Sequence, residues 1–255
     1  MKKYILSLAM LTLISAQAWS EGWFQNTNVY ARVGYSIGGT APLDMPATIR
    51  KLNSYSPRSN VNAGIELYKP INNHWGMATG IYIENKGMKT DATVKNYHME
   101  ITRGGETLEG LFTGNVSTTV RQWMWTLPIL ATYEFGSHFR LKIGPYGSVI
   151  TSKSFEGAAY DGYLRKGNPT GDKILLGHEE GQRGTYNFSK DMRSLQWGIK
   201  VGCDYHFSKH WGGFVEVNWG VAGVFKRDFH TIEQTMYPIY GNFGLRSLWL
   251  KKTAS

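Results

Sequence analysis

The chain has 255 residues, and its 28 Lys and Arg against 19 Asp and Glu give a formal net charge of +9 at pH 7. Its single cysteine, Cys203, excludes an internal disulfide as a source of stability. Beyond the first residues, no stretch reaches the roughly 18 consecutive apolar residues of a transmembrane helix. That leaves a protein built of strands, rich in glycine (30), tyrosine (15) and tryptophan (9).

The first 18 residues have the pattern of a cleaved export signal. Lys2 and Lys3 precede a short apolar run, and Ala16-Gln17-Ala18 has the small-x-small form of a cleavage site. We expect residues 1–18 to be a signal peptide and residues 19–255 to form one exported domain. An exported chain without runs of Lys and Arg among aromatics is not expected to bind nucleic acid.

Eight segments of the exported part show period-two alternation, with one apolar face and one polar or small face. Most reach the roughly 9 to 11 residues that a tilted strand needs to cross a bilayer. The pattern predicts an all-β fold, an eight-stranded antiparallel up-and-down transmembrane β-barrel with a filled polar lumen. The predicted strands are Asn28 to Ile37, Asn60 to Tyr68, Trp75 to Met88, Thr119 to Phe135, Phe139 to Ile150, Ser194 to Phe207, Trp211 to Val224 and Gln234 to Leu250.

Charged residues within these strands fall on the face opposite to the apolar one. An interior of eight strands is just wide enough to be filled by side chains, so opposite charges there can pair across the lumen. The predicted lumen network contains six basic and five acidic residues: Arg32, Glu66, Glu84, Lys86, Glu134, Arg140, Lys142, Lys200, Asp204, Glu216 and Arg246.

The connections between the predicted strands alternate in length. Lys69 to His74, Gly136 to His138 and Ser208 to His210 are short, whereas Gly38 to Ser59, Lys89 to Thr118, Thr151 to Arg193 and Phe225 to Glu233 are long. In bacterial barrels the short turns face the periplasm and the long loops face outward. The sequence therefore predicts long extracellular loops.

Aromatic residues lie at both ends of the apolar faces, as in proteins that cross two headgroup layers. Two belts are predicted. Next to the short turns the girdle contains Trp75, Phe135, Phe139, Phe207, Trp211 and Trp249, and next to the long loops it contains Tyr35, Trp123, Trp125, Trp219 and Tyr237.

Local motifs at strand ends add a family resemblance. They are Glu84–Asp91, Leu127–Tyr133, Leu141–Tyr146, Tyr160–Arg165 and Met236–Tyr240. In these motifs the chain resembles the PorT-like outer-membrane β-barrel proteins of Bacteroidota, a porin-like family of Gram-negative bacteria. The resemblance implies an outer-membrane location and, through the name member of the family, an association with secretion of surface proteases by the type IX system.

The predicted outward loops carry residue types that could support catalysis. They offer His98, His178 and His230 with the hydroxyls of Ser117, Ser152, Ser154 and Ser189. Nucleophilic catalysis needs a base next to the hydroxyl and a third group that orients the base, and no spacing in these loops indicates such a set. The glycine- and aspartate-containing segment Asp161 to Asp172 lacks the alternating acids of a calcium loop. We expect no catalytic residue, no metal site and no cofactor.

The sequence therefore favours a non-enzymatic, monomeric outer-membrane barrel. Its neighbours would be outer-membrane lipid and lipopolysaccharide, and its outward loops would bind a protein or glycolipid partner. The loops carry Tyr97, Phe112, Phe155 and Tyr186, which suit either partner contacts or packing among the loops. Two alternatives stay open: a lipid A modifying enzyme, acyltransferase or deacylase, and a small passive pore.

Overall fold

The computed structural model describes residues 26–42, 46–229, 231–232 and 235–251. The predicted signal peptide, residues 1–18, lies outside this range, as does His230. Among the helices of the described part, none has the length and apolar character needed to cross a membrane.

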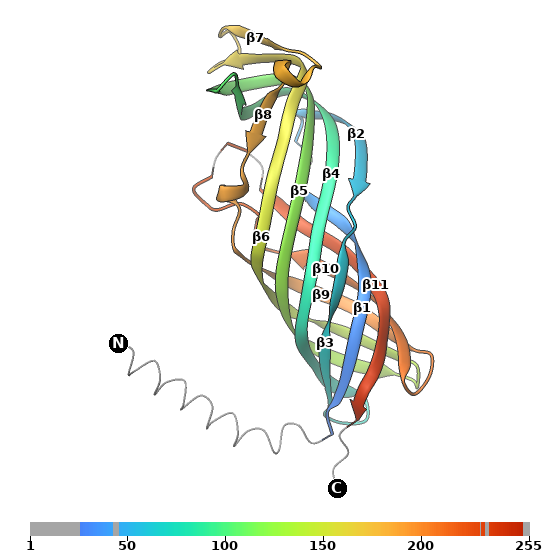
Figure 1. Ribbon diagram of the computed structural model, residues 1–255. Helices are drawn as coiled ribbons and strands as arrows, with labels where there is room; N and C mark the ends of the chain where they lie inside the picture. The colour runs from blue at the N-terminus through green and yellow to red at the C-terminus, as the bar shows by residue number, and fades with distance from the viewer. Residues whose placement is uncertain (1–25, 43–45, 230, 233–234, 252–255) are drawn as a thin grey trace, which may run out of the picture.

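Eight strands form a closed ring. Each pairs antiparallel with its neighbours, and the first strand, β1 (Asn28–Pro42), pairs with the last, β11 (Met236–Lys251), from Asn28↔Lys251 to Pro42↔Met236. The predicted eight-stranded barrel is therefore confirmed (Figure 1). The ring strands are β1 (Asn28–Pro42), β3 (Val61–Pro70), β4 (Trp75–Arg103), β5 (Glu106–Phe135), β6 (Phe139–Lys166), β9 (Leu195–His206), β10 (Trp211–Gly220) and β11 (Met236–Lys251).

The alternation of side chains follows the predicted register. Lys200 and Glu216 are 1% and 2% exposed, whereas their neighbours Val201 and Val217 are each 48% exposed. Successive residues of a strand point to opposite faces, so the polar set lies inside and the apolar set covers the outer wall.

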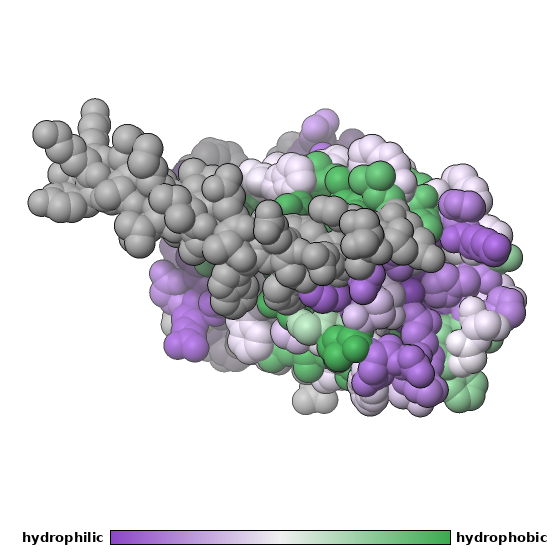
Figure 2. Space-filling view, turned by 90° about the horizontal axis from the view of Figure 1, so that it is seen from below, coloured by the Kyte–Doolittle hydropathy of each residue, from purple (hydrophilic) through white to green (hydrophobic). Residues whose placement is uncertain are grey.

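Short turns close the lower end of the barrel. In the turn after β3 the side chain of Asn72 accepts hydrogen bonds from the backbone N–H groups of His74 (2.9 Å) and Trp75 (2.8 Å). Ser208 does the same for His210 (3.3 Å) and Trp211 (3.1 Å). Such side chains satisfy the backbone of a tight turn. Seen from this end, hydrophilic residues are prominent around the molecule, with hydrophobic patches between them (Figure 2).

Three strands are much longer than predicted. β4, β5 and β6 have 29, 30 and 28 residues and rise side by side beyond the other ring strands (Figure 1). The predicted ends at Met88, Thr119 and Ile150 were wrong. Between Val94 and Tyr97, β4 contains one extra residue relative to β5. This bulge shifts the alternation of side chains along β4, so a search for period two does not detect that the strand continues.

The predicted loop Lys89 to Thr118 is consequently a β-hairpin. Gly104 and Gly105 have φ angles of +60° and +87°, as a two-residue hairpin turn requires. Arg103 pairs with Glu106 across this turn. Two of the other three predicted long loops also contain regular structure. Gly38 to Ser59 contains β2 (Ile49–Pro57), and Thr151 to Arg193 contains β7 (Lys173–Leu176), β8 (Gly184–Asn187) and the short 3-10 helices η1 (Glu180–Gln182) and η2 (Ser189–Asp191).

We call the part above the ring the extension: residues 89–103 of β4, 106–120 of β5 and 151–166 of β6, with β2, β7 and β8. β2 pairs with β4 above the segment where β3 pairs with it. β7 and β8 both pair with β6. The remainder, between the short turns and the extension, we call the barrel half. The molecule thus has two interiors, one inside the barrel half and one on the inner face of the extension.

Candidate functional site

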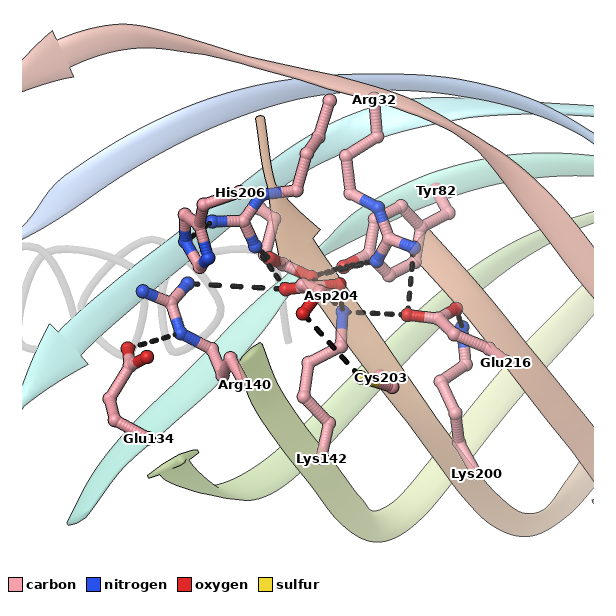
Figure 3. Close-up of polar contacts among 12 residues, drawn as sticks. Arg32, Tyr82, Glu134, Arg140, Lys142, Lys200, Cys203, Asp204, His206 and Glu216 are labelled. Carbon is pink, nitrogen blue, oxygen red and sulfur yellow. Dashed lines mark hydrogen bonds and ion pairs between the residues drawn. The ribbon is translucent and has the colours of Figure 1, made fainter. Parts of the chain in front are cut away.

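The interior of the barrel half contains an ionic network. Nζ of Lys142 lies 2.7 Å from Oδ1 of Asp204, 2.7 Å from Oε1 of Glu216 and 3.2 Å from Oε2 of Glu66. Arg32 bridges Glu66 and Glu216, with each of its terminal nitrogens 2.7 Å from a carboxylate oxygen. The side chains of Arg32, Lys142, Asp204 and Glu216 come from different strands and point toward one another inside the lumen (Figure 3).

All eleven predicted lumen residues form at least one ion pair. Nine of them are linked in one network, which we call the ionic plug: Arg32, Glu66, Glu134, Arg140, Lys142, Lys200, Asp204, Glu216 and Arg246. Glu84 and Lys86 form a separate pair at 2.8 Å. Ten of the eleven are buried, and Glu134, near the short turns, has a side chain that is 22% exposed.

Aromatic and neutral polar groups complete the plug. The guanidinium of Arg32 lies 3.8 Å from the ring centre of Phe214, and that of Arg246 lies 3.9 Å from the ring centre of Tyr30. The hydroxyl of Tyr82 donates to Glu66 at 3.0 Å and accepts from Arg32 at 3.0 Å. Tyr82 was absent from the predicted network, although it shares the inward parity of Glu84. A buried ionic network persists when each charge has several partners of this kind.

The outer wall of the barrel half has the opposite character. Nine of the eleven predicted girdle residues are exposed there: Trp75, Phe135, Phe139, Phe207, Trp211, Trp249, Trp123, Trp125 and Trp219. Tyr35 and Tyr237 are partly buried. The hydroxyl of Tyr35 donates to the carbonyl of Arg58 at 2.8 Å, which turns this ring toward the extension.

The extension has an apolar core on its inner face. Phe112 and Leu164 are fully buried, and Phe155 packs edge-on against Phe225 with ring centres 4.9 Å apart. Phe112, Phe155 and Tyr186 therefore pack among the loops, which is one of the two roles that the sequence left open for them. The signal was the alternation of Phe112, Val116 and Val120, which keeps the parity of Gln122 in the barrel half. The extra residue at the slip opposite Thr113 and Asn115 lies in β6, between Tyr160 and Tyr163.

An apolar chamber of about 520 Å³ lies between this inner face and the outer ends of β1 and β11. Its lining includes residues 37–42 of β1 and Ile49 and Leu52 of β2. From β4 it includes Met88, Thr90, Ala92, Val94, Tyr97 and Met99. None of the described residues that line it carries a charge. Volumes of this size are typical of sites for small molecules.

The chamber lies at a seam where the sheet divides. β1 pairs with β3 only as far as Tyr35↔Val61, whereas β2 pairs with β4. The β1–β3 side ends with one more bond, from Ser36 N–H to the carbonyl of Asn60 at 2.8 Å. Across the seam, the hydroxyl of Tyr55 in β2 donates to the carbonyl of Gly38 in β1 at 2.6 Å. The described ladders contain no pairing between β1 and β2.

Neither described histidine that was considered for catalysis, His98 or His178, is hydrogen-bonded to a serine hydroxyl of the described residues. His98 contacts the carbonyl of Thr231 at 3.2 Å and Glu109 at 3.3 Å, and His178 contacts Asp161 at 2.9 Å. The hydroxyl of Ser189 instead accepts from the backbone N–H of Phe155 at 3.0 Å.

Two tyrosines of the extension have altered acidity. Partial burial and a hydrogen bond to Asp91 raise the pKa of Tyr160 to about 12. Burial raises the pKa of Tyr186 as well, and its hydroxyl lies 2.6 Å from that of Thr118. Both groups are held protonated, which suits structural hydrogen bonds. Within the described ranges, no three His, Cys, Asp or Glu side chains are placed to hold a metal ion.

Comparisons with known proteins place the chain in a class. The sequence profile described as "Outer membrane protein beta-barrel domain" matches residues 16–226. Among solved structures, the chain is similar to Ail, the attachment invasion locus protein of Yersinia pestis, at 9% identity and a TM-score of 0.39, covering 89% of this chain and 100% of that one. It is also similar to the translocator domain of autotransporter NalP from Neisseria meningitidis, at 11% identity and a TM-score of 0.25, covering 97% and 98%. A comparison with curated proteins gave no match.

Proposed function

Because the chain belongs to the outer membrane protein β-barrel domain family, we propose that it is a non-enzymatic outer-membrane barrel that binds a partner through its extension. The supporting observation is the length of β4, β5 and β6, which have 28 to 30 residues where about 9 to 11 suffice to cross a bilayer. The additional residues form a platform with its own apolar core, held outside the membrane.

A rigid platform lowers the entropy lost when a partner binds, because its surface is already ordered. The tip is open to such contacts, since Gly104, Gly105, Glu106 and Thr107 are exposed. The partner is a protein or a surface glycolipid. Its engagement serves a process at the cell surface, such as the secretion with which PorT-like proteins are associated.

The ionic plug supports a binding role over conductance. Its charges are buried and paired across the lumen, and eight strands leave little more space than side chains fill. We expect no stable conductance in single-channel recordings of the purified protein. A steady open level would instead support a pore.

Photo-crosslinking in living cells tests the partner. In a Cys203→Ala background, Thr107→Cys places a single thiol at the exposed tip, and Ser137→Cys places the matched thiol in a short turn. Each is coupled to a photoreactive benzophenone maleimide. We expect a discrete adduct at Thr107→Cys that is absent from Ser137→Cys, and its mass distinguishes a protein from a glycolipid. Equal labelling of the two sites, or none at the tip, would contradict the proposal.

A further inference from the structure

The apolar chamber suits an apolar ligand because most of its described lining is apolar and three of the lining hydroxyl groups are already hydrogen-bonded. The hydroxyl of Tyr55 is used by the carbonyl of Gly38 at 2.6 Å, and those of Thr118 and Tyr186 bond to each other at 2.6 Å. The rest of the lining comes mainly from aliphatic and Met side chains and from the glycine-containing segment of β1. An apolar chain gains from leaving water here, whereas a polar ligand would lose hydrogen bonds.

The flanks of the seam are continuous with the lipid-facing wall. Ile37 and Ile239 line the chamber and are 47% and 37% exposed. On the same strands, Val33 and Phe243 belong to the exposed apolar wall. Leu52, on the other side of the seam, is 50% exposed and also lines the chamber. An apolar path therefore leads from the outer wall into the chamber.

The strand beside this path is basic. β2 contains Arg50 and Lys51, both exposed, and no Asp or Glu. Arg58, just after β2, is exposed as well. Basic groups next to an apolar opening match a lipid whose head carries a negative charge.

We infer that the chamber holds an acyl chain of an anionic lipid from the outer leaflet, which enters through the seam between β1 and β2 with its head beside Arg50 and Lys51. The extension provides the ceiling of this site, and the top of the barrel half provides the floor. The site is separate from the exposed tip that the partner proposal uses. Either can therefore fail without the other.

The test uses the mature protein reconstituted in vesicles that contain phosphatidylglycerol with a diazirine on one acyl chain. After illumination, labelled peptides are located by mass spectrometry. We expect adducts on residues 37–42, 49–55 or 88–99, in addition to adducts on the lipid-facing wall at positions such as Ile81 and Val215. Adducts confined to the wall would overturn the inference. This measurement uses the unsubstituted protein, so it does not require that a substituted protein folds.

A filled chamber provides the matched comparison. Ala92→Phe places a ring in the chamber, and Ala131→Phe makes the same change on the exposed outer wall. We expect Ala92→Phe to lower chamber labelling at least about fivefold, since the ring occupies volume that the chain needs, and Ala131→Phe to leave it unchanged. In each variant, the amount of chamber labelling is divided by the amount of labelling on the lipid-facing wall. Undiminished chamber labelling in folded Ala92→Phe would overturn the inference.

Gly39→Leu obstructs the seam itself. A Cβ at Gly39 would lie 2.8 Å from Sδ of Met88 and 3.6 Å from the ring of Tyr55, so a longer side chain there closes the entrance. Chamber labelling should fall as it does in Ala92→Phe. Labelling that survives both variants counts against entry by this route.

Two further experiments identify the kind of molecule that supplies the acyl chain. Phosphatidylcholine with the same diazirine chain should label the chamber less than phosphatidylglycerol does, and the double variant Arg50→Gln, Lys51→Gln should remove this preference. Diazirine-bearing palmitic acid represents a free acid. Labelling by the free acid without labelling by phosphatidylglycerol would overturn the assignment to a membrane lipid.

Discussion

The barrel half and the extension are built from the same strands but have opposite interiors. In β5 the inward-facing residues of the extension include Val116 and Val120, and those of the barrel half include Gln122 and Thr126. The outward face changes in the reverse sense, from Arg121, next to the extension, to Leu127 and Ile129 deeper in the barrel half.

The medium outside explains the difference. Lipid around the barrel half favours apolar side chains outside and leaves polar groups to pair within the lumen. Water around the extension favours polar groups outside and an apolar core inside. A single strand therefore changes its polarity where it leaves the membrane, and the chamber lies near this change. Four sets of substitutions, in order of decreasing effect, separate the two regions.

The strongest destabilisation is expected from Glu66→Gln in the ionic plug. Glu66 is fully buried and contacts Arg32, Lys142 and Arg246. Removal of one partner from a buried ion pair costs about 3–5 kcal/mol, because the remaining charges stay desolvated. Urea unfolding in vesicles, followed by heat-modifiable migration on gels, measures it. Glu106→Gln at the exposed tip is the control, and an equal loss in both would contradict the role of the plug.

Phe112→Ala tests the core of the extension. Loss of a buried Phe side chain costs about 3–5 kcal/mol where it packs. Since this cost falls on the extension, the barrel should keep its heat-modifiable migration while limited proteolysis cuts the segment between Met88 and Val120. Phe135→Ala, on the exposed wall, should leave the proteolytic pattern as it is. Global unfolding of Phe112→Ala would show that the two regions fold as one.

A lysine placed on the outward face of β5 should separate the two media. Ile129→Lys puts the charge on the wall of the barrel half, where a charge facing lipid costs about 2–4 kcal/mol near the midplane. Thr119→Lys puts the same charge on the same face in the extension, where the effect should stay within about 0.5 kcal/mol. Similar losses of unfolding free energy at the two positions would contradict a change from lipid to water between Ile129 and Thr119.

The weakest effect concerns Tyr160. The folded protein raises its pKa to about 12 from an ordinary value of 10.0, chiefly by burial and by the bond to Asp91. The neutral phenol is thus favoured on folding, and its contribution to stability is complete below pH 10 and is lost as the pH rises through about 12. Tyr160→Phe should remove this step from the dependence of stability on pH. Tyr163→Phe, on the same strand, should retain it.

The sequence alone determined the barrel half. Strict alternation, paired with short turns and two aromatic belts, was enough to predict eight strands and the inward set that includes Lys142 and Glu216, because lipid outside and charge inside select opposite residue types at successive positions. The extension was not predicted, because extra residues in β4 before Tyr97 and in β6 between Tyr160 and Tyr163 break the period that identifies a strand.

Only the tertiary structure decided the rest. Which charges meet in the plug depends on the stagger between strands far apart in the chain, as for Arg32 and Glu216. The chamber depends on where β1 and β2 separate, a feature that no local pattern encodes. Its lining comes from five ring strands and two elements of the predicted loops, so it exists only once the extension has folded over the end of the barrel.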